Sequence, residues 1–218
     1  MKYPRTHHLP WSLGAQSDDK TLANCDHFIG KKIVVTEKMD GENCTAHFNG
    51  HIHARSLDSA GGIDRDWVKK FLLENVCFNL PEGWRVCGEN LFAKHSISYD
   101  NLESYFMGFS IWDNENSCLS WEDTISWFAL LNVQPVKVIY EGSYDEKLLK
   151  ELLKTMDFSK QEGYVIRLND KFHYSEFDKS VAKFVRDKHV QTDKHWRHSA
   201  IVPNVLKKET YEKEACNS

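Results

Sequence analysis

One short stretch constrains this chain more than any other: a run of β-branched residues that ends on a lysine and leads directly into a turn. Residues 33–38 read Ile-Val-Val-Thr-Glu-Lys, and Asp40 and Gly41 follow. β-Branched residues favour strands, whereas Asp-Gly favours a turn. A rigid strand would hold the lysine, and the glycine would let backbone and a ligand phosphate approach closely. The stretch indicates an amine presented to an electrophile, although alone it also fits an ordinary surface lysine before a hairpin turn.

Further strand patterns and a few helix patterns follow without strict alternation. Asn49-Gly50 between two short strand patterns is a strong hairpin signal. Ser120 and Asp123 form a capping box for one helix, and Asp64 can cap another. We therefore expect an α+β fold of mainly antiparallel sheets with flanking helices. The expected strands are 32–37, 44–48, 51–55, 84–89, 105–112, 136–140, 163–168 and 180–186; the expected helices are 65–75, 121–131 and 144–155; residues 1–30 are expected to be loop with a short helix.

Composition excludes several classes of protein. The 218 residues carry a net charge of −4, so nucleic-acid binding would need a local basic patch. No apolar run approaches the ~20 residues of a membrane helix, and the first residues lack the apolar core of a signal peptide. The 6 cysteines are scattered and the 11 histidines have no zinc spacing, which favours free thiols in a reducing compartment. We expect a cytoplasmic protein that does not enter a membrane.

Charged residues stand where other predicted strands begin or end. Arg55 closes the hairpin, and Glu89 ends a strand directly after a glycine. Glu162 opens a later strand directly before a glycine, and Lys183 lies within the last one. An aromatic strand at 105–111 comes between them in the sequence. Each motif alone fits an ordinary turn or core position, so the weight of the argument lies in the ordered set.

In this order the motifs resemble those of the covalent nucleotidyltransferases, the polynucleotide ligases and mRNA capping enzymes. That family has a nucleophilic lysine, an arginine, a Gly-Glu strand end, an aromatic strand, a Glu-Gly strand and a lysine strand. All have a match between Lys38 and Arg186, about two thirds of the chain. The spacing of Lys38, Gly41 and Asn43 is similar to the first motif of nick-sealing ATP-dependent RNA ligases. The chain also resembles short, single-domain bacterial and phage members of the RNA ligase family.

The resemblance implies a role for each motif residue. Lys38 would attack the α-phosphate of ATP and form a lysyl-AMP adduct, for which its amine must be neutral. Lys183 would contact the α-phosphate and, together with a bound Mg²⁺ or Mn²⁺, lower the pKa of Lys38. Glu162 would help to hold that divalent ion. Glu89 would hold the ribose, with Arg55 beside the ribose and phosphate.

The aromatic strand and the residues around the lysine complete the implied nucleotide site. Phe109 would stack on adenine, and Phe106, which faces the other side of that strand, is the alternate. Glu37 would lie at the adenine edge, mostly through its backbone. Asn43 would serve the later strand-joining steps.

The C-terminal part departs from the family pattern. The last motif of many ligases has two lysines separated by one residue, whereas the second position here is Val185. Contact with the triphosphate would therefore shift to Arg186 or Lys188. We expect a nucleotidyltransferase domain over 1–186. About 30 residues follow Arg186, too few for an OB domain, and we expect 187–218 to form a docked helical segment.

Three functions are open at this point. The first is a monomeric RNA ligase that seals a 5′-phosphate RNA end to a 3′-hydroxyl end, most readily in a nicked duplex. The second is a stand-alone adenylyltransferase that passes AMP to another acceptor or needs a partner for end sealing. The third is a nucleotide-binding module without activity. The module without activity is disfavoured, because the motif residues are all present: Lys38, Glu89, Glu162 and Lys183.

Overall fold

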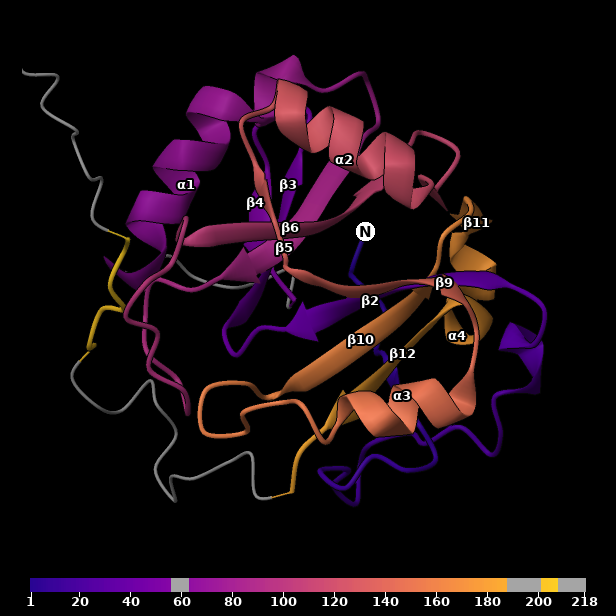
Figure 1. The fold of residues 1–218 in the computed structure, drawn as a ribbon. Helices are drawn as coiled ribbons and strands as arrows, with labels where there is room; N and C mark the ends of the chain where they lie inside the picture. Colours follow the sequence, from indigo (N-terminus) through magenta and orange to yellow (C-terminus); the bar gives the residue numbers. More distant parts are fainter. Residues whose placement is uncertain (56–62, 188–200, 208–218) are drawn as a thin grey trace, which may run out of the picture.

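Two β-sheets face each other across the interior of the protein, and helices cover their outer sides (Figure 1). The computed structural model describes residues 1–55, 63–187 and 201–207. Within these ranges, all but two of the strand pairings are antiparallel. This is the mainly antiparallel α+β arrangement that the sequence predicts.

The first sheet contains the strand that carries the lysine. Its register pairs Lys38 with Gly163, so the start of the Glu-Gly strand lies beside the end of the lysine strand. This pairing brings together two motifs that are more than a hundred residues apart in the sequence. In spatial order the strands are β1 (His7–His8), β12 (Val181–Val185), β10 (Gly163–Leu168), β2 (Lys32–Lys38) and β9 (Val138–Ser143).

The second sheet begins directly after the lysine. The chain crosses from one sheet to the other within residues 39–41, so Lys38 stands at the crossing. In spatial order the strands are β11 (Phe172–His173), β7 (Ser117–Cys118), β6 (Phe106–Trp112), β5 (Arg85–Asn90), β3 (Glu42–His47) and β4 (Ile52–Ala54), and β8 (Gln134–Pro135) pairs with β6.

Alternation along β2 explains how one strand serves both the core and the site. Ile33 and Val35 pack into the core cluster beneath α3 (Glu146–Leu152), on the outer side of the first sheet. Val34 points the other way, into a cluster between the sheets. Thr36 and Lys38 share this inward phase and line the central cavity, because side chains alternate between the two faces of a strand.

The remaining helices cover the outer side of the second sheet and one edge. α1 (Ile63–Asn75) and α2 (Trp121–Leu130) contribute Val68 and Phe128 to a core cluster with Ile111 of β6. Ser120 caps α2 as predicted, because its hydroxyl accepts a hydrogen bond from the Asp123 N–H at 3.1 Å. None of the helices that the structure describes is long and apolar enough to cross a bilayer. The short helical turns are α4 (Phe177–Ser180), η1 (Asp26–Phe28), η2 (Cys77–Asn79) and η3 (Tyr174–Glu176).

Three local predictions differ from the structure. Asp64 does not cap its helix, because α1 already begins at Ile63; Asp64 lies in the first turn, where a carboxylate favours the positive end of the helix. The strand predicted at 136–140 begins only at Val138 of β9, because Pro135 still pairs with the second sheet and the chain crosses to the first sheet in between. Residues 1–30 are mostly loop with the short helix η1, as expected, but they also include β1, which pairs with β12 and therefore belongs to the first sheet.

The segment 201–207, part of the predicted helical tail, is extended and packs against the loop 91–105. Pro203 and Leu206 form β-bridges with residues of the loop 91–105. Asn204 is 2% exposed, and its amide accepts from the Tyr99 N–H and donates to the Leu91 carbonyl. These bonds to loop backbone, rather than bonds within a helix, fix this segment. Residues 188–200 and 208–218 of the predicted helical tail lie outside the described residues.

Gly163 is expected to be irreplaceable even by alanine. Its φ is 158°, and an added Cβ would lie 2.0 Å from the Phe184 carbonyl oxygen of the neighbouring strand β12. Gly163→Ala must therefore push β10 and β12 apart, and should cost more than about 2 kcal/mol of unfolding free energy in chemical denaturation. Gly30→Ala is the control, because Gly30 has a φ of 74° but no atom within 4 Å of the added Cβ. An equal loss in both variants would contradict this account.

Candidate active site

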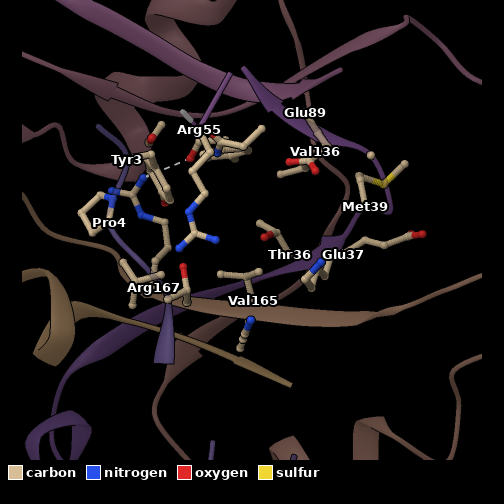
Figure 2. Close-up of a pocket in the computed structure, with 18 of the residues that line it drawn as sticks. Tyr3, Pro4, Thr36, Glu37, Met39, Arg55, Glu89, Val136, Val165 and Arg167 are labelled. Atoms are coloured by element: carbon tan, nitrogen blue, oxygen red, sulfur yellow. Dashed lines mark hydrogen bonds between the residues drawn. The ribbon is translucent and has the colours of Figure 1, made fainter. Parts of the chain in front are cut away.

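A cavity of about 640 Å³ lies between the two sheets. Both sheets contribute to its walls, with Lys38 and Lys183 from the first and Glu89 and Phe109 from the second. Figure 2 shows Arg55 reaching into this space. In the same view Tyr3 and Pro4 lie at one side, whereas Glu37 and Met39 lie at the other. A cavity of this size is typical of small-molecule sites.

Lys38, the last residue of β2 before the turn, is paired with a buried carboxylate. Its Nζ donates a hydrogen bond to Glu162, which is 6% exposed. The pairing of Lys38 with Gly163 sets this contact, since Glu162 directly precedes Gly163. The Arg186 N–H donates to the Glu162 carbonyl at 2.9 Å and fixes the backbone from the other side. The positions of β2, β10 and β12 therefore fix the geometry of the ion pair between Lys38 and Glu162.

The turn after Lys38 explains the Asp-Gly signal. A Cβ at Gly41 would lie 2.5 Å from the Asn90 carbonyl oxygen, so the close approach here is to the backbone of β5. The Asp40 carboxylate accepts from the Ile97 N–H at 2.7 Å, and the Asp40 N–H donates to the Tyr99 hydroxyl at 2.9 Å. The same loop is held by Asn204, so the 201–207 segment supports the lysine turn indirectly.

Carboxylates dominate the charge around the lysine. Burial alone would lower the pKa of Lys38, but the charges of Glu162 and Glu89 outweigh it and raise that pKa above its usual value. In the protein by itself the carboxylates therefore prevail, and the lowering of this pKa by Lys183 together with a bound divalent ion stays a prediction. Lys183 instead has a lowered pKa, first through burial and then through the nearby Lys38 charge.

The pKa of the Glu89 carboxyl group is strongly raised. Burial raises its pKa to about 8, although the charge of Lys38 opposes that shift. This carboxyl therefore takes up a proton more readily than an ordinary glutamate and, once protonated, can donate a hydrogen bond. Glu89 lies opposite Asn43 in the register of β3 with β5. The Asn43 side-chain oxygen also lines the cavity side of the sheet, buried and without a hydrogen-bond partner among the described residues.

Phe109, which lies at a β-bulge, is the aromatic residue of β6 that faces the cavity. The pairs Cys87 with Ser110 and Gly88 with Gly108 leave Phe109 as the extra residue of β6. Bulges next to sites redirect side chains, and Phe109 lines the cavity. Phe106 is 0% exposed and packs in the outer core cluster beneath α1. Of the two candidates, the structure therefore places Phe109 at the cavity and Phe106 in the core.

The other predicted residues divide into two groups. Glu37 and Arg55 line the cavity, and burial raises the pKa of Glu37. Arg186 does not belong to the lining; its Nε is buried and has no hydrogen-bond partner among the described residues. Val185 is buried in the sheet, so this position offers no cation to the site. Lys188 lies outside the described residues.

Several lining residues carried no clear signal in the sequence. Val165 faces the cavity on the first sheet, opposite the sheet that carries Phe109, and strict alternation along β10 would have indicated it. Arg167 lies on the same face, but its guanidinium donates a hydrogen bond to the Leu119 carbonyl at 2.6 Å, so its role is structural. Tyr3 packs against Phe109 at 5.2 Å between ring centroids. Nothing local in the sequence marks Tyr3 as a cavity residue.

The two-sheet fold is similar to that of solved RNA ligases. A mutant Naegleria gruberi RNA ligase solved with ATP and Mn has a TM-score of 0.54 at 17% identity, covering 77% of this chain and 53% of that one. An archaeal ATP-dependent RNA ligase has a TM-score of 0.56 at 13% identity, covering 85% and 48%. These likenesses show the fold.

The family follows from the sequence itself. The family model described as RNA ligase matches residues 31–185, more than two thirds of the chain. The chain therefore belongs to the RNA ligase family. The comparison with curated proteins gave no match. The chain spans about half the length of the solved ligases that it resembles.

Proposed function

We propose that this protein is an ATP-dependent RNA ligase that works through a covalent Lys38–AMP intermediate. The observation that carries the proposal is the position of Lys38 at a strand end inside the cavity, hydrogen-bonded to the buried Glu162. Lys183 lines the same cavity from β12 and supplies a second cation. An amine and a cation in one enclosed site suit nucleophilic attack on a phosphate.

The reaction consists of three nucleotidyl transfers. The neutral Lys38 Nζ attacks the α-phosphorus of ATP; an N–P bond forms, the nitrogen loses a proton to solvent, the P–O bond to the β-phosphate breaks, and pyrophosphate leaves. An oxygen of an RNA 5′-phosphate then attacks the same phosphorus, the N–P bond breaks, and the Lys38 nitrogen takes up a proton and leaves as the amine. Finally a 3′-hydroxyl attacks the activated 5′-phosphate, loses its proton and expels AMP. Lys183 would stabilise the charge that grows on the phosphoryl oxygens in these steps.

The remaining lining residues fit the parts of the nucleotide. Phe109 and Val165 come from opposite sheets and would enclose the adenine, with Glu37 at its edge. The protonated Glu89 carboxyl would bond a ribose hydroxyl, with Arg55 beside the ribose and phosphate. The unpartnered oxygen of Asn43 would accept a bond in the strand-joining steps. Arg186 does not line the cavity, so it would contact the triphosphate only at the edge of the site.

The carboxylates near Lys38 suit a hard divalent cation. Within the described residues no three Asp, Glu, His or Cys side chains form a metal cage. Mg²⁺ commonly takes one or two carboxylates and fills its shell with phosphate oxygens and water, so Glu162 fits this use. Bound Mg²⁺ or Mn²⁺ would neutralise charge on the transferred phosphate. Glu162 would then hold the Lys38 proton less firmly, which favours the neutral amine.

A stand-alone adenylyltransferase is the second candidate. It shares the self-adenylation step with the first candidate, and Lys38, Glu162 and Lys183 would serve that step equally well. For the ligase, a nick favours joining, because base pairing holds the 3′-hydroxyl beside the 5′-phosphate. We therefore propose a nicked duplex as the preferred substrate of the protein, acting as a monomer.

The two candidates differ in what accepts the AMP. Protein adenylated with labelled ATP and Mg²⁺ is freed of nucleotide and supplied with nicked RNA that carries a 5′-phosphate. Transfer of label to the RNA, followed by sealing, is the expected result. The same duplex with a 5′-hydroxyl is the control and should accept nothing. Label that stays on the protein with every RNA would favour the second candidate.

A further inference from the structure

A second hollow, of about 540 Å³, adjoins the active-site cavity. The two spaces share Tyr3, Pro4 and Arg55, so one leads into the other at the arginine. In Figure 2, Arg55 lies between Tyr3 and Pro4 on one side and Glu37 and Met39 on the other. The hollow is lined by Lys2, Tyr3, Pro4, Arg5, Arg55 and Tyr174.

The charge of this hollow differs from that of the whole chain. Among the residues that the structure describes, its lining has the cations Lys2, Arg5 and Arg55 and no carboxylate, whereas the chain has a net charge of −4. All three cations are exposed. Arg5 donates hydrogen bonds to the Asp18 carbonyl and carboxylate, at 2.5 and 3.3 Å. That ion pair is exposed and therefore weak, so a phosphate can compete for the guanidinium.

The segment that supplies the two outer cations is fixed in place. The Tyr3 ring is wedged between Phe109 and Phe177, at 5.2 and 5.3 Å between centroids. The Tyr174 hydroxyl donates to the Lys2 carbonyl at 2.9 Å. The cations thus project from an anchored backbone, which reduces the entropy lost when they bind an anion.

We propose that this hollow binds the sugar-phosphate backbone of the RNA strand whose 5′-phosphate accepts AMP. The inference rests on the proposed ligase function and adds the place where the polynucleotide is held. A substrate longer than one nucleotide must extend beyond the cavity, and the hollow is the adjoining space with cations for phosphates. Tyr174, half-buried at its edge, offers a ring on which an unpaired base can stack.

The test measures RNA binding without requiring catalysis. Affinity for a fluorescent, 5′-phosphorylated RNA oligonucleotide is measured by anisotropy at several salt concentrations, for the wild type and for Lys2→Glu and Arg5→Gln. The logarithm of the affinity should fall less steeply with the logarithm of salt in each variant, by about 0.7 for each lost phosphate contact. Self-adenylation with labelled ATP should be unchanged. Lys154→Glu is the control, because Lys154 is 72% exposed and follows α3 on the outer side of the first sheet.

Two other outcomes would overturn the inference, and a third would bear on the proposed function alone. Variants that bind RNA with the affinity and salt slope of the wild type and of Lys154→Glu would exclude the hollow as the RNA site. Loss of self-adenylation with a raised requirement for ATP would assign the hollow to the triphosphate instead. Failure of the wild type to adenylate itself would refute the proposed function, and the binding measurement would still decide what the hollow holds.

Discussion

Lys38→Ala should lower covalent self-adenylation by at least about a thousandfold, to below detection on a gel. The reason is that the variant removes the atom that forms the bond to phosphorus, and no positioning effect can replace a nucleophile. The fold should survive, because Lys38 is the last residue of β2 and stands outside the apolar clusters. Unfolding curves of the variant and the wild type should show this. The Lys38 ammonium also neutralises Glu162, so some change in stability is compatible with the account.

Lys32→Ala is the matched control for this variant. Lys32 is the first residue of the same strand, exposed at its opposite end, and does not line the cavity. Its loss should leave labelling within about twofold of the wild type, as expected for an exposed position away from the site. Labelling of Lys38→Ala at the level of Lys32→Ala would remove Lys38 from the reaction.

Glu162→Gln is the second variant with a large expected effect, and it should act in two opposite directions. Loss of the carboxylate should cut the maximal rate of self-adenylation by at least about a hundredfold, because the amide binds a divalent ion poorly. Glu162 also raises the pKa of Lys38. The neutral amine is the reactive form, so the rate should increase as the pH approaches that pKa from below. Without Glu162 the pKa of Lys38 falls, and this rise should move to lower pH.

The pH profile therefore separates a role at the site from simple damage to the fold. Self-adenylation is measured between acid and alkaline pH at several Mg²⁺ concentrations, for the wild type, Glu162→Gln and Glu141→Gln. Glu141 is an exposed carboxylate on the neighbouring strand β9 and should behave as the wild type. A reduced rate with an unshifted profile and an unchanged need for Mg²⁺ would contradict both roles of Glu162.

Strands with a strong local pattern could be predicted from the sequence. The β-branched run of β2 and the position of Lys38 at its end are local properties, and the structure has them as expected. The capping box at Ser120 is equally local, because its bonds join residues three apart. The choice between Phe106 and Phe109 was not local, because alternation puts them on opposite faces of β6 and only the packing of the two sheets shows which face lines the cavity.

The parts that could not be predicted depend on long-range pairing. Tyr3 becomes a cavity residue because its ring packs against Phe109 and Phe177, far along the chain. The raised pKa of Lys38 depends on carboxylates from two other strands, which no spacing in the sequence brings close. The role of Asn204 depends on its hydrogen bonds to the backbone of the loop 91–105, which the sequence around Asn204 does not indicate. Pairing partners separated by more than a hundred residues leave no trace in a local window.

The most direct test of the account is to locate the AMP. The protein is incubated with ATP and Mg²⁺, digested, and its peptides are sequenced by mass spectrometry. We predict one phosphoramide-linked AMP for each protein molecule, on Lys38. An adduct on Lys183 or another residue, or an intact protein that carries no AMP after incubation, would contradict the account.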